Sequence, residues 1–183
     1  MKFLKSLFEW IVIIVVAFVL SLVIRNFVID TRIVPTGSML PTIQLDDRLI
    51  VDRLFYKFDM INRGDIVVFK STKDMVSEEE DLVKRVIGLP GEEIQIKNGK
   101  VFVNGKALYE PYIAEAPAYE YGPVTVPPNS YFMLGDNRND SKDSHIWGFV
   151  DSDLILGRVW IRYWPLDRFG KVNQIPPDYF SEK

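Results

Sequence analysis

Two alternating runs of apolar and polar residues meet in the segment Glu93-Ile-Gln-Ile-Lys-Asn-Gly-Lys-Val-Phe-Val-Asn-Gly105. Period-two alternation is typical of a half-buried β-strand, and the Asn98-Gly99 pair between the runs is a strong signal for a tight hairpin turn. The pair Asn104-Gly105 predicts a second tight turn directly after the second run. The segment therefore indicates antiparallel strands and a mainly β fold.

Short runs rich in β-branched and aromatic residues extend this pattern on both sides of the segment. They predict strands within residues 48–54, 64–69, 130–134 and 154–164. No segment of helical periodicity and useful length follows residue 30. The stretch from Pro111 to Pro128 is predicted to be a proline-rich loop, and residues 89–128 are expected to form a peripheral hairpin or insert.

The N-terminus carries a strongly apolar run, in which Trp10 to Ile24 are 15 residues without a charge. A helix over this run covers roughly 23 Å of a hydrocarbon core near 30 Å, so flanking residues must contribute to a span. Lys2 and Lys5 precede the run and favour a cytoplasmic N-terminus. We therefore expect residues 1–29 to form a single-pass membrane anchor and residues 30–183 to form an extracytoplasmic β domain.

A cleaved signal peptide and a buried core helix are the alternative interpretations of this run. No small-x-small cleavage site follows it, because the sequence continues as Asp30-Thr-Arg-Ile-Val-Pro35. Residues 11–20 are apolar on every face, whereas a helix packed on a protein surface carries a polar stripe. Both observations favour the uncleaved anchor.

The composition of the chain narrows the chemistry that it can perform. The 183 residues carry a net charge of −3, no cysteine and a single histidine, His145. These counts exclude a disulfide scaffold, a cysteine nucleophile and a multi-histidine metal site, and the charge gives no reason to expect a nucleic-acid partner. The polar run after Gly135 fails the EF-hand template, because Arg138 stands at a ligand position. We expect no metal and no cofactor.

Because the chain has no cysteine, a catalytic nucleophile must be a serine or a threonine. The base must then be histidine, a carboxylate or lysine. Ser38 lies in a turn bracketed by Gly37 and two prolines, and such turns can present a side chain together with free backbone N–H groups. Lys84 lies in a predicted strand on the same face as Leu82 and Val86. Burial there lowers the pKa of a lysine, which a general base requires. Taken singly, the two features also fit an ordinary loop and a surface lysine on an edge strand.

Four segments together resemble the sequence boxes of bacterial type I signal peptidases, in the family's order and behind an N-terminal anchor. They are Pro35-Thr-Gly-Ser-Met-Leu-Pro-Thr42, Gly64-Asp-Ile-Val-Val-Phe69, Lys84-Arg-Val-Ile-Gly-Leu-Pro-Gly-Glu92 and Gly135-Asp-Asn-Arg-Asn-Asp-Ser-Lys-Asp-Ser144. The short chain with one span is similar to the compact Gram-positive form. The resemblance implies a serine endopeptidase of the plasma membrane that removes signal peptides from exported preproteins, with an extracytoplasmic antiparallel β catalytic domain.

The resemblance also implies a role for each matching position. Ser38 is expected to be the nucleophile and Lys84 its general base, which is the Ser-Lys variant of triad chemistry. Thr36 stands where the family usually has serine, and its hydroxyl is expected to hold the oxyanion together with the Ser38 N–H. Ser141 is expected to hydrogen-bond the Lys84 amine and orient it.

Three further positions of the last box are expected to support the site structurally. Arg138 and Asp143 are expected to brace the loop that carries Ser141. His145 departs from the family, which usually has arginine at this position. Its ion pair is therefore expected to be weaker and pH-sensitive.

Two other functions remain open on the sequence alone. A self-cleaving repressor-type peptidase shares the Ser-Lys dyad, but it predicts a DNA-binding N-terminal domain where this chain has an apolar run. A membrane-tethered β binding module without catalysis is the second alternative. The expected partners are the signal peptides of preproteins and the lipid bilayer, whereas the oligomeric state is not predicted.

Overall fold

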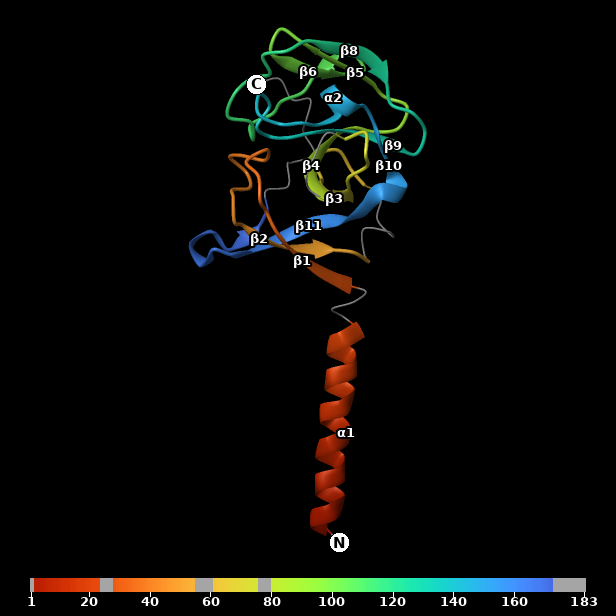
Figure 1. The fold of residues 1–183 in the computed structure, drawn as a ribbon, viewed down its shortest axis with the longest axis vertical. Coiled ribbons are helices and arrows are strands. Elements are labelled where there is room, and N and C mark those ends of the chain that lie inside the picture. Colours follow the sequence, from red (N-terminus) through yellow and green to blue (C-terminus); the bar gives the residue numbers. More distant parts are fainter. Residues whose placement is uncertain (1, 24–27, 55–60, 76–79, 173–183) are drawn as a thin grey trace.

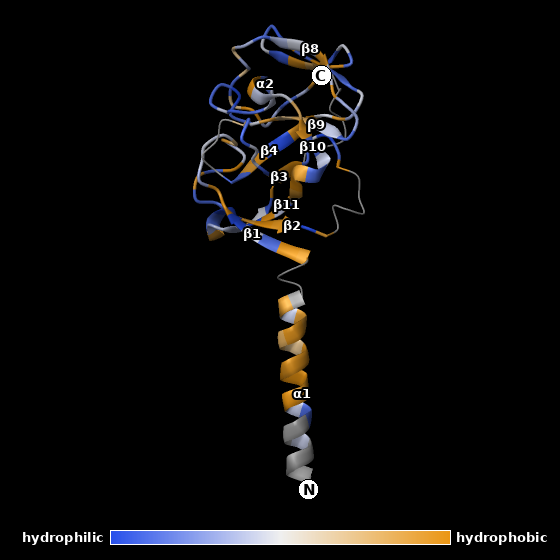
Figure 2. Ribbon diagram, turned by 45° about the vertical axis from the view of Figure 1, so that its right-hand side comes forward, coloured by the Kyte–Doolittle hydropathy of each residue, from blue (hydrophilic) through white to orange (hydrophobic). Residues whose placement is uncertain are grey.

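Helix α1 (Lys2–Val23) extends away from a body of β-strands in the computed structural model, which describes residues 2–23, 28–54, 61–75 and 80–172 (Figure 1). The residues along the upper part of the helix are apolar, as the orange ribbon in Figure 2 shows, and their side chains are exposed. The predicted anchor over residues 1–29 extends beyond the described residues at position 1 and at positions 24–27. Within the described ranges, no helix has the combination of length and apolar character that a membrane span requires.

The larger sheet has eight strands, and every pairing in it is antiparallel. Its order is β1 (Ile29–Ile33), β2 (Arg48–Asp52), β11 (Ile155–Trp164), β3 (Ile66–Lys70), β4 (Asp81–Gly88), β9 (Ser130–Leu134) and β10 (Val150–Asp151), and β12 (Gly170–Lys171) pairs with β11. Strand β4 lies between β3 and β9, so it is an interior strand. The predicted mainly antiparallel β fold is confirmed.

A second sheet contains the alternating segment over residues 93–105. Its order is β7 (Lys106–Ala107), β6 (Lys100–Val103), β5 (Glu93–Lys97) and β8 (Tyr121–Thr125). Asn98 and Gly99 have positive φ angles of 51° and 71°, as a type I′ hairpin turn requires, so the predicted hairpin is confirmed. Figure 1 places this sheet at the end of the body far from α1, and β1, β2 and β11 at the near end.

The prediction of a loop over Pro111 to Pro128 was wrong in part, because β8 lies within it. Proline lacks a backbone N–H and is tolerated in a sheet on an edge strand. Pro123 satisfies this rule, since β8 pairs only with β5. The remaining helical elements are short: α2 (Ser144–Trp147), η3 (Ser152–Leu154) and η4 (Leu166–Arg168).

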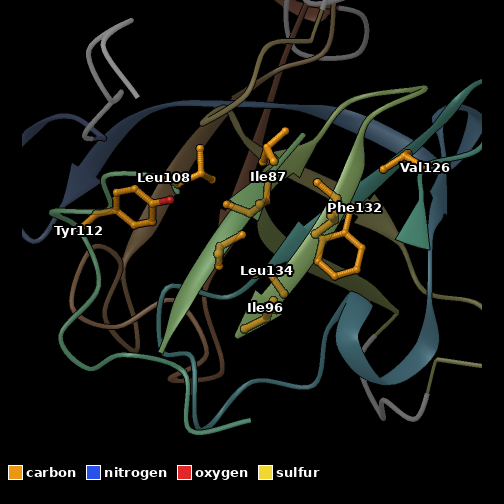
Figure 3. Close-up of a cluster of buried hydrophobic side chains, with 10 residues drawn as sticks. Ile87, Ile96, Leu108, Tyr112, Val126, Phe132 and Leu134 are labelled. Carbon is orange, nitrogen blue, oxygen red and sulfur yellow. The ribbon is translucent and has the colours of Figure 1, made fainter. Parts of the chain in front are cut away.

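One buried apolar cluster joins the two sheets. It combines Ile87 and Phe132 of the larger sheet with Ile94 and Ile96 of the smaller one, and all four are fully buried (Figure 3). Because such a cluster is close-packed, the second sheet is held in a fixed position against β4 and β9. These two strands lead directly into the segments that carry the candidate site.

Candidate active site

Ser38 lies in the loop between β1 and β2, and this loop is held at both ends. The Val34 N–H donates to the Asp47 carbonyl at 3.0 Å and closes its base. Met39 and Ile43 are buried in the core below it. Because Met39 and Ile43 are packed in the core, the backbone around Ser38 is fixed. Ser38 itself stays half-buried.

Lys84 lies on β4, which is an interior strand of the larger sheet. It pairs with Val67 of β3 and is only 3% exposed. Its Nζ lies 2.6 Å from the Ser38 Oγ, although the two residues are 46 positions apart. The structure thus brings together the two residues that the sequence analysis singled out for nucleophile and base.

Burial changes the proton affinity of this lysine. Desolvation lowers the pKa of Lys84 to about 8, and the nearby carboxylates of Asp143 and Asp136 act in the opposite direction. At pH 7.4 about one lysine in five is then neutral, compared with about one in a thousand at an ordinary pKa. A neutral amine in contact with a serine hydroxyl can act as its general base.

Thr36 lies on the exposed side of the same loop. Its Oγ1 is 3.4 Å from the Ser38 Oγ. A hydroxyl at this distance can donate to an oxygen that develops negative charge next to Ser38. The structure therefore places Thr36 beside the nucleophile, on the side open to solvent.

The segment over residues 135–145 forms the wall of the site behind Ser38; we call it the catalytic-site loop. Asn137 connects it to the nucleophile, because its N–H donates to the Ser38 carbonyl at 3.1 Å and its Nδ2 donates to the Gly37 carbonyl at 3.1 Å. Asn137 belongs to the last of the four boxes, but its local sequence predicts no role for it. Nothing in the local sequence indicates a partner 100 positions away.

Ser141 lies at the centre of this loop, and its side chain is buried. Its Oγ has no hydrogen-bond partner among the described residues. A Cβ atom placed on Gly135 would lie 2.2 Å from the Ser141 Oγ and 2.5 Å from the Ser38 carbonyl oxygen. Ser141 therefore lies next to the nucleophile, but the structure shows no hydrogen bond from it to Lys84.

Asp143 ties the two ends of the catalytic-site loop together. It accepts a hydrogen bond from the Gly135 N–H at 2.9 Å, and its other oxygen lies 2.7 Å from the His145 Nδ1. The His145 ring stacks on Tyr119 with the ring centroids 4.0 Å apart. Both Asp143 and His145 lie behind the dyad rather than in contact with the Ser38 hydroxyl.

A buried ion pair beside Lys84 was missed by the sequence analysis. Arg85 donates to Asp136 through two hydrogen bonds of 2.7 and 2.6 Å, and both side chains are fully buried. Thr42 also donates to Asp136, at 2.6 Å. Alternation along β4 predicts an outward side chain for Arg85, but β4 is covered on both faces. The pair fixes the start of the catalytic-site loop to β4.

A serine hydroxyl in contact with a buried amine of lowered pKa is a combination that can carry out acyl transfer through an ester on serine. Within the residues that the structure describes, no three His, Asp or Glu side chains are grouped to hold a metal ion. The reacting groups supplied by this chain are one hydroxyl, one amine of lowered pKa, and N–H and O–H donors beside them.

The chain is similar to several known proteins over most of its length. A family model described as "Signal peptidase, peptidase S26" matches residues 7–164. A probable signal peptidase I-2 of Synechocystis is 49% identical over 85% of this chain and 72% of its own length. Signal peptidase I of Leptolyngbya laminosa is 47% identical over 88% and 81%, and signal peptidase IB of Staphylococcus aureus is 35% identical over 90% and 93%. A crystal structure of a signal peptidase I from Enterococcus faecalis is 31% identical and covers 55% of this chain and 97% of its own, with a TM-score of 0.48.

Proposed function

This chain belongs to the peptidase S26 family of signal peptidases, and we propose that Ser38 and Lys84 are its catalytic dyad. The activity is the hydrolytic removal of signal peptides from preproteins. The observation that carries the dyad is the 2.6 Å contact between the Ser38 Oγ and a buried Lys84 Nζ of lowered pKa. Each of these properties is what a Ser-Lys mechanism requires.

The proposed reaction has two stages. In the first, neutral Lys84 takes the hydroxyl proton of Ser38, the Oγ attacks the scissile carbonyl carbon, and the C–N bond then breaks. The resulting ammonium of Lys84 returns that proton to the departing amine, which leaves an ester on Ser38. In the second, Lys84 takes a proton from water, whose oxygen attacks the ester carbonyl carbon. The bond from that carbon to the Ser38 Oγ then breaks, and the Lys84 ammonium returns the proton to the Oγ. The Thr36 hydroxyl and the Ser38 N–H stabilise the oxyanion in both stages.

The remaining predicted residues support this dyad from the catalytic-site loop. The unpartnered hydroxyl of Ser141 is available to orient the Lys84 amine during turnover. Asp143 and His145 hold the far end of the loop, and Arg138 holds its start.

The rate of cleavage is expected to rise with pH, because the neutral form of Lys84 is the active base. With a pKa of about 8, kcat/KM is expected to increase roughly tenfold from pH 7 to pH 9 and to level off above it. The measurement is cleavage of a signal-peptide substrate that has no group titrating in this range. A profile that is flat from pH 6 to pH 9 under chemistry-limited conditions contradicts the proposal.

The variant His145→Gln tests whether the titrating group is the lysine. If Lys84 is the base, the rising limb remains near pH 8 in this variant, even where the rate itself falls. If His145 were the base, the rising limb would disappear on substitution.

We further propose that residues 1–29 anchor the enzyme in the plasma membrane with the N-terminus in the cytoplasm, and that residues 30–183 form the extracytoplasmic catalytic domain. Three observations support this proposal: the uncharged run from Trp10 to Ile24, the exposed apolar side chains of α1, and the two lysines before the run. Leu166 and Phe169 of the near end of the body are also 70% and 65% exposed. Apolar side chains of this size fit a surface close to lipid.

The anchor can be tested on the full-length protein in membranes. The protein is expected to stay in the membrane fraction after alkaline carbonate extraction, and external protease is expected to digest the β body in right-side-out vesicles. Release into the soluble fraction contradicts the anchor, and protection of the body in such vesicles contradicts the orientation.

A further inference from the structure

The segment between β7 and β8 crosses the back of the catalytic-site loop. Its Glu110 accepts two parallel hydrogen bonds from the Arg138 guanidinium, at 2.9 and 2.8 Å. The two side chains are 5% and 0% exposed. A bidentate pair of this kind fixes the orientation of both partners. Glu110, which lies between two strands of the second sheet, therefore determines the position of Arg138.

Arg138 transfers this constraint to the backbone beside the nucleophile. Its Nε donates to the Gly135 carbonyl at 3.0 Å, while the Gly135 N–H is held by Asp143 at 2.9 Å. Both peptide groups of Gly135 are thus fixed. Gly135 in turn lies so close to the Ser38 carbonyl that a Cβ there would approach it to 2.5 Å. A shift of Gly135 would consequently displace the backbone that carries the Ser38 hydroxyl.

The negative charge of Glu110 is what keeps Arg138 in this place. Burial alone lowers the pKa of Arg138, but the Glu110 carboxylate, with smaller contributions from Tyr112 and Asp136, holds the pKa above its ordinary value. A buried cation that loses its partner is strongly unfavourable and moves toward water. Without a carboxylate at position 110, the guanidinium would leave the Gly135 carbonyl.

Tyr112 holds the Glu110 carboxylate in one position. Its hydroxyl donates to the Glu110 carboxylate at 2.7 Å, and the Arg138 guanidinium lies 5.8 Å from its ring centroid. The Tyr112 ring is packed in the apolar cluster shared by the two sheets, with Leu108 and Ile87 (Figure 3). The Glu110 carboxylate is therefore held in a preformed position.

We propose that Glu110 is a positioning residue of the peptidase reaction, which acts through Arg138 and Gly135 on the backbone that carries Ser38. The proposal rests on the Ser38-Lys84 dyad. It links Glu110, which lies outside the four family boxes, to Ser38 by way of Arg138 and Gly135. Because this path ends on the backbone that holds Ser38 beside Lys84, loss of the Glu110 charge is expected to lower the rate of the chemical step rather than to weaken substrate binding.

The test is Glu110→Gln, which keeps the shape of the side chain and removes its charge. In the full-length enzyme, kcat is expected to fall about tenfold to a hundredfold, because misplacement of a reacting group by about 1 Å has effects of this size. KM is expected to stay within about twofold, and the rising pH limb is expected to stay near pH 8. A kcat within about twofold of the parent enzyme overturns the proposal.

The chain offers a matched control in a second Arg-Glu pair. Arg63 donates to Glu92 through both guanidinium nitrogens, and these side chains are also mostly buried. This pair braces the end of β4, because Arg63 donates to the Ile87 carbonyl and the Leu89 N–H donates to Glu92. Glu92→Gln is expected to lower the melting temperature by an amount comparable to Glu110→Gln while leaving kcat within about twofold. An equal loss of kcat in both variants overturns the proposal, because it would then reflect general destabilisation.

A double-mutant cycle identifies the path of the effect. In the Arg138→Met background, adding Glu110→Gln is expected to change kcat by less than about twofold, since the link is already broken. Independent, multiplying effects contradict the path through Arg138. Glu110→Asp keeps the charge and is expected to recover part of the lost kcat, which provides a second readout if the glutamine variant folds poorly.

Ser38→Ala, measured in parallel, separates the two proposals. If Ser38→Ala is inactive and Glu110→Gln has the parent kcat, the dyad stands and the positioning role is overturned. If Ser38→Ala retains activity, the dyad is overturned and the role of Glu110 is overturned with it.

Discussion

Lys84→Met is expected to reduce kcat at least about a thousandfold and, at the same time, to make the folded enzyme more stable at pH 7. The loss of activity follows because methionine cannot accept the Ser38 proton, and removal of a general base in contact with its nucleophile has effects of this order. The measurement is single-turnover cleavage of a signal-peptide substrate at pH 9, where the parent enzyme has its base in the neutral form.

The gain in stability follows from the direction of the pKa shift. The pKa of Lys84 is about 8 in the folded state and close to 10.5 in the unfolded chain, so the unfolded chain binds more protons between these values. Burial of the lysine therefore opposes folding fully below about pH 8, and this penalty declines as the pH rises toward 10.5. The penalty is of the order of 3 kcal/mol. Methionine is an apolar side chain of similar length, so the substitution removes this penalty. Thermal melting at pH 6 and pH 10 measures the difference.

Lys70→Met is the matched control, because Lys70 is an exposed lysine on the neighbouring strand β3. It is expected to leave kcat and stability nearly unchanged. Unaltered cleavage by Lys84→Met would eliminate the dyad and favour a β body without this catalytic chemistry. A fall in stability at pH 7 would contradict the buried, desolvated state of Lys84.

Gly135→Ala is expected to have the second largest effect, a loss of kcat/KM of about a hundredfold or more. The added Cβ would lie 2.2 Å from the Ser141 Oγ and 2.5 Å from the Ser38 carbonyl oxygen, distances that neither group can accept. Because the second atom belongs to the backbone of the nucleophile, relief of the clash displaces Ser38 from Lys84. Overpacking of this kind is also expected to lower the stability by about 1–3 kcal/mol.

Gly157→Ala separates misplacement of Ser38 from loss of stability. A Cβ at Gly157 would lie 2.5 Å from the Asp52 carbonyl oxygen, so the clash with backbone is equally severe. Gly157 lies on β11, away from the catalytic-site loop. This variant is expected to lose comparable stability but to keep kcat within about twofold. Parent-like activity of Gly135→Ala would contradict the tight contact between Gly135 and Ser38.

Much of the fold follows from local signals. The Asn98-Gly99 pair needs positive φ angles, and the alternating runs beside it have one apolar face each, so the hairpin of β5 and β6 is determined by neighbouring residues alone. Strand β8 was missed because its sequence has weak strand propensity. Pairing with β5 and burial of part of its surface outweigh that propensity.

The candidate site also contains residues that the local sequence predicts and residues that it does not. Ser38 and Lys84 could be singled out because each lies in a distinctive local pattern and in a box that resembles a known family. Asn137, Glu110 and the Arg85-Asp136 pair could not, because their partners lie between 28 and 100 positions away. A polar residue whose function depends on a distant partner carries no local signature.

The sequence by itself determined the class of strands and turns, the apolar N-terminal run, and the choice of a serine and a lysine as reacting groups. Only the tertiary structure decided that Lys84 meets Ser38 and that its amine is partly neutral near pH 7. The physical reason is that residue identity and spacing govern backbone conformation over a few residues. The separation of two side chains and the water around them depend on how distant strands pack.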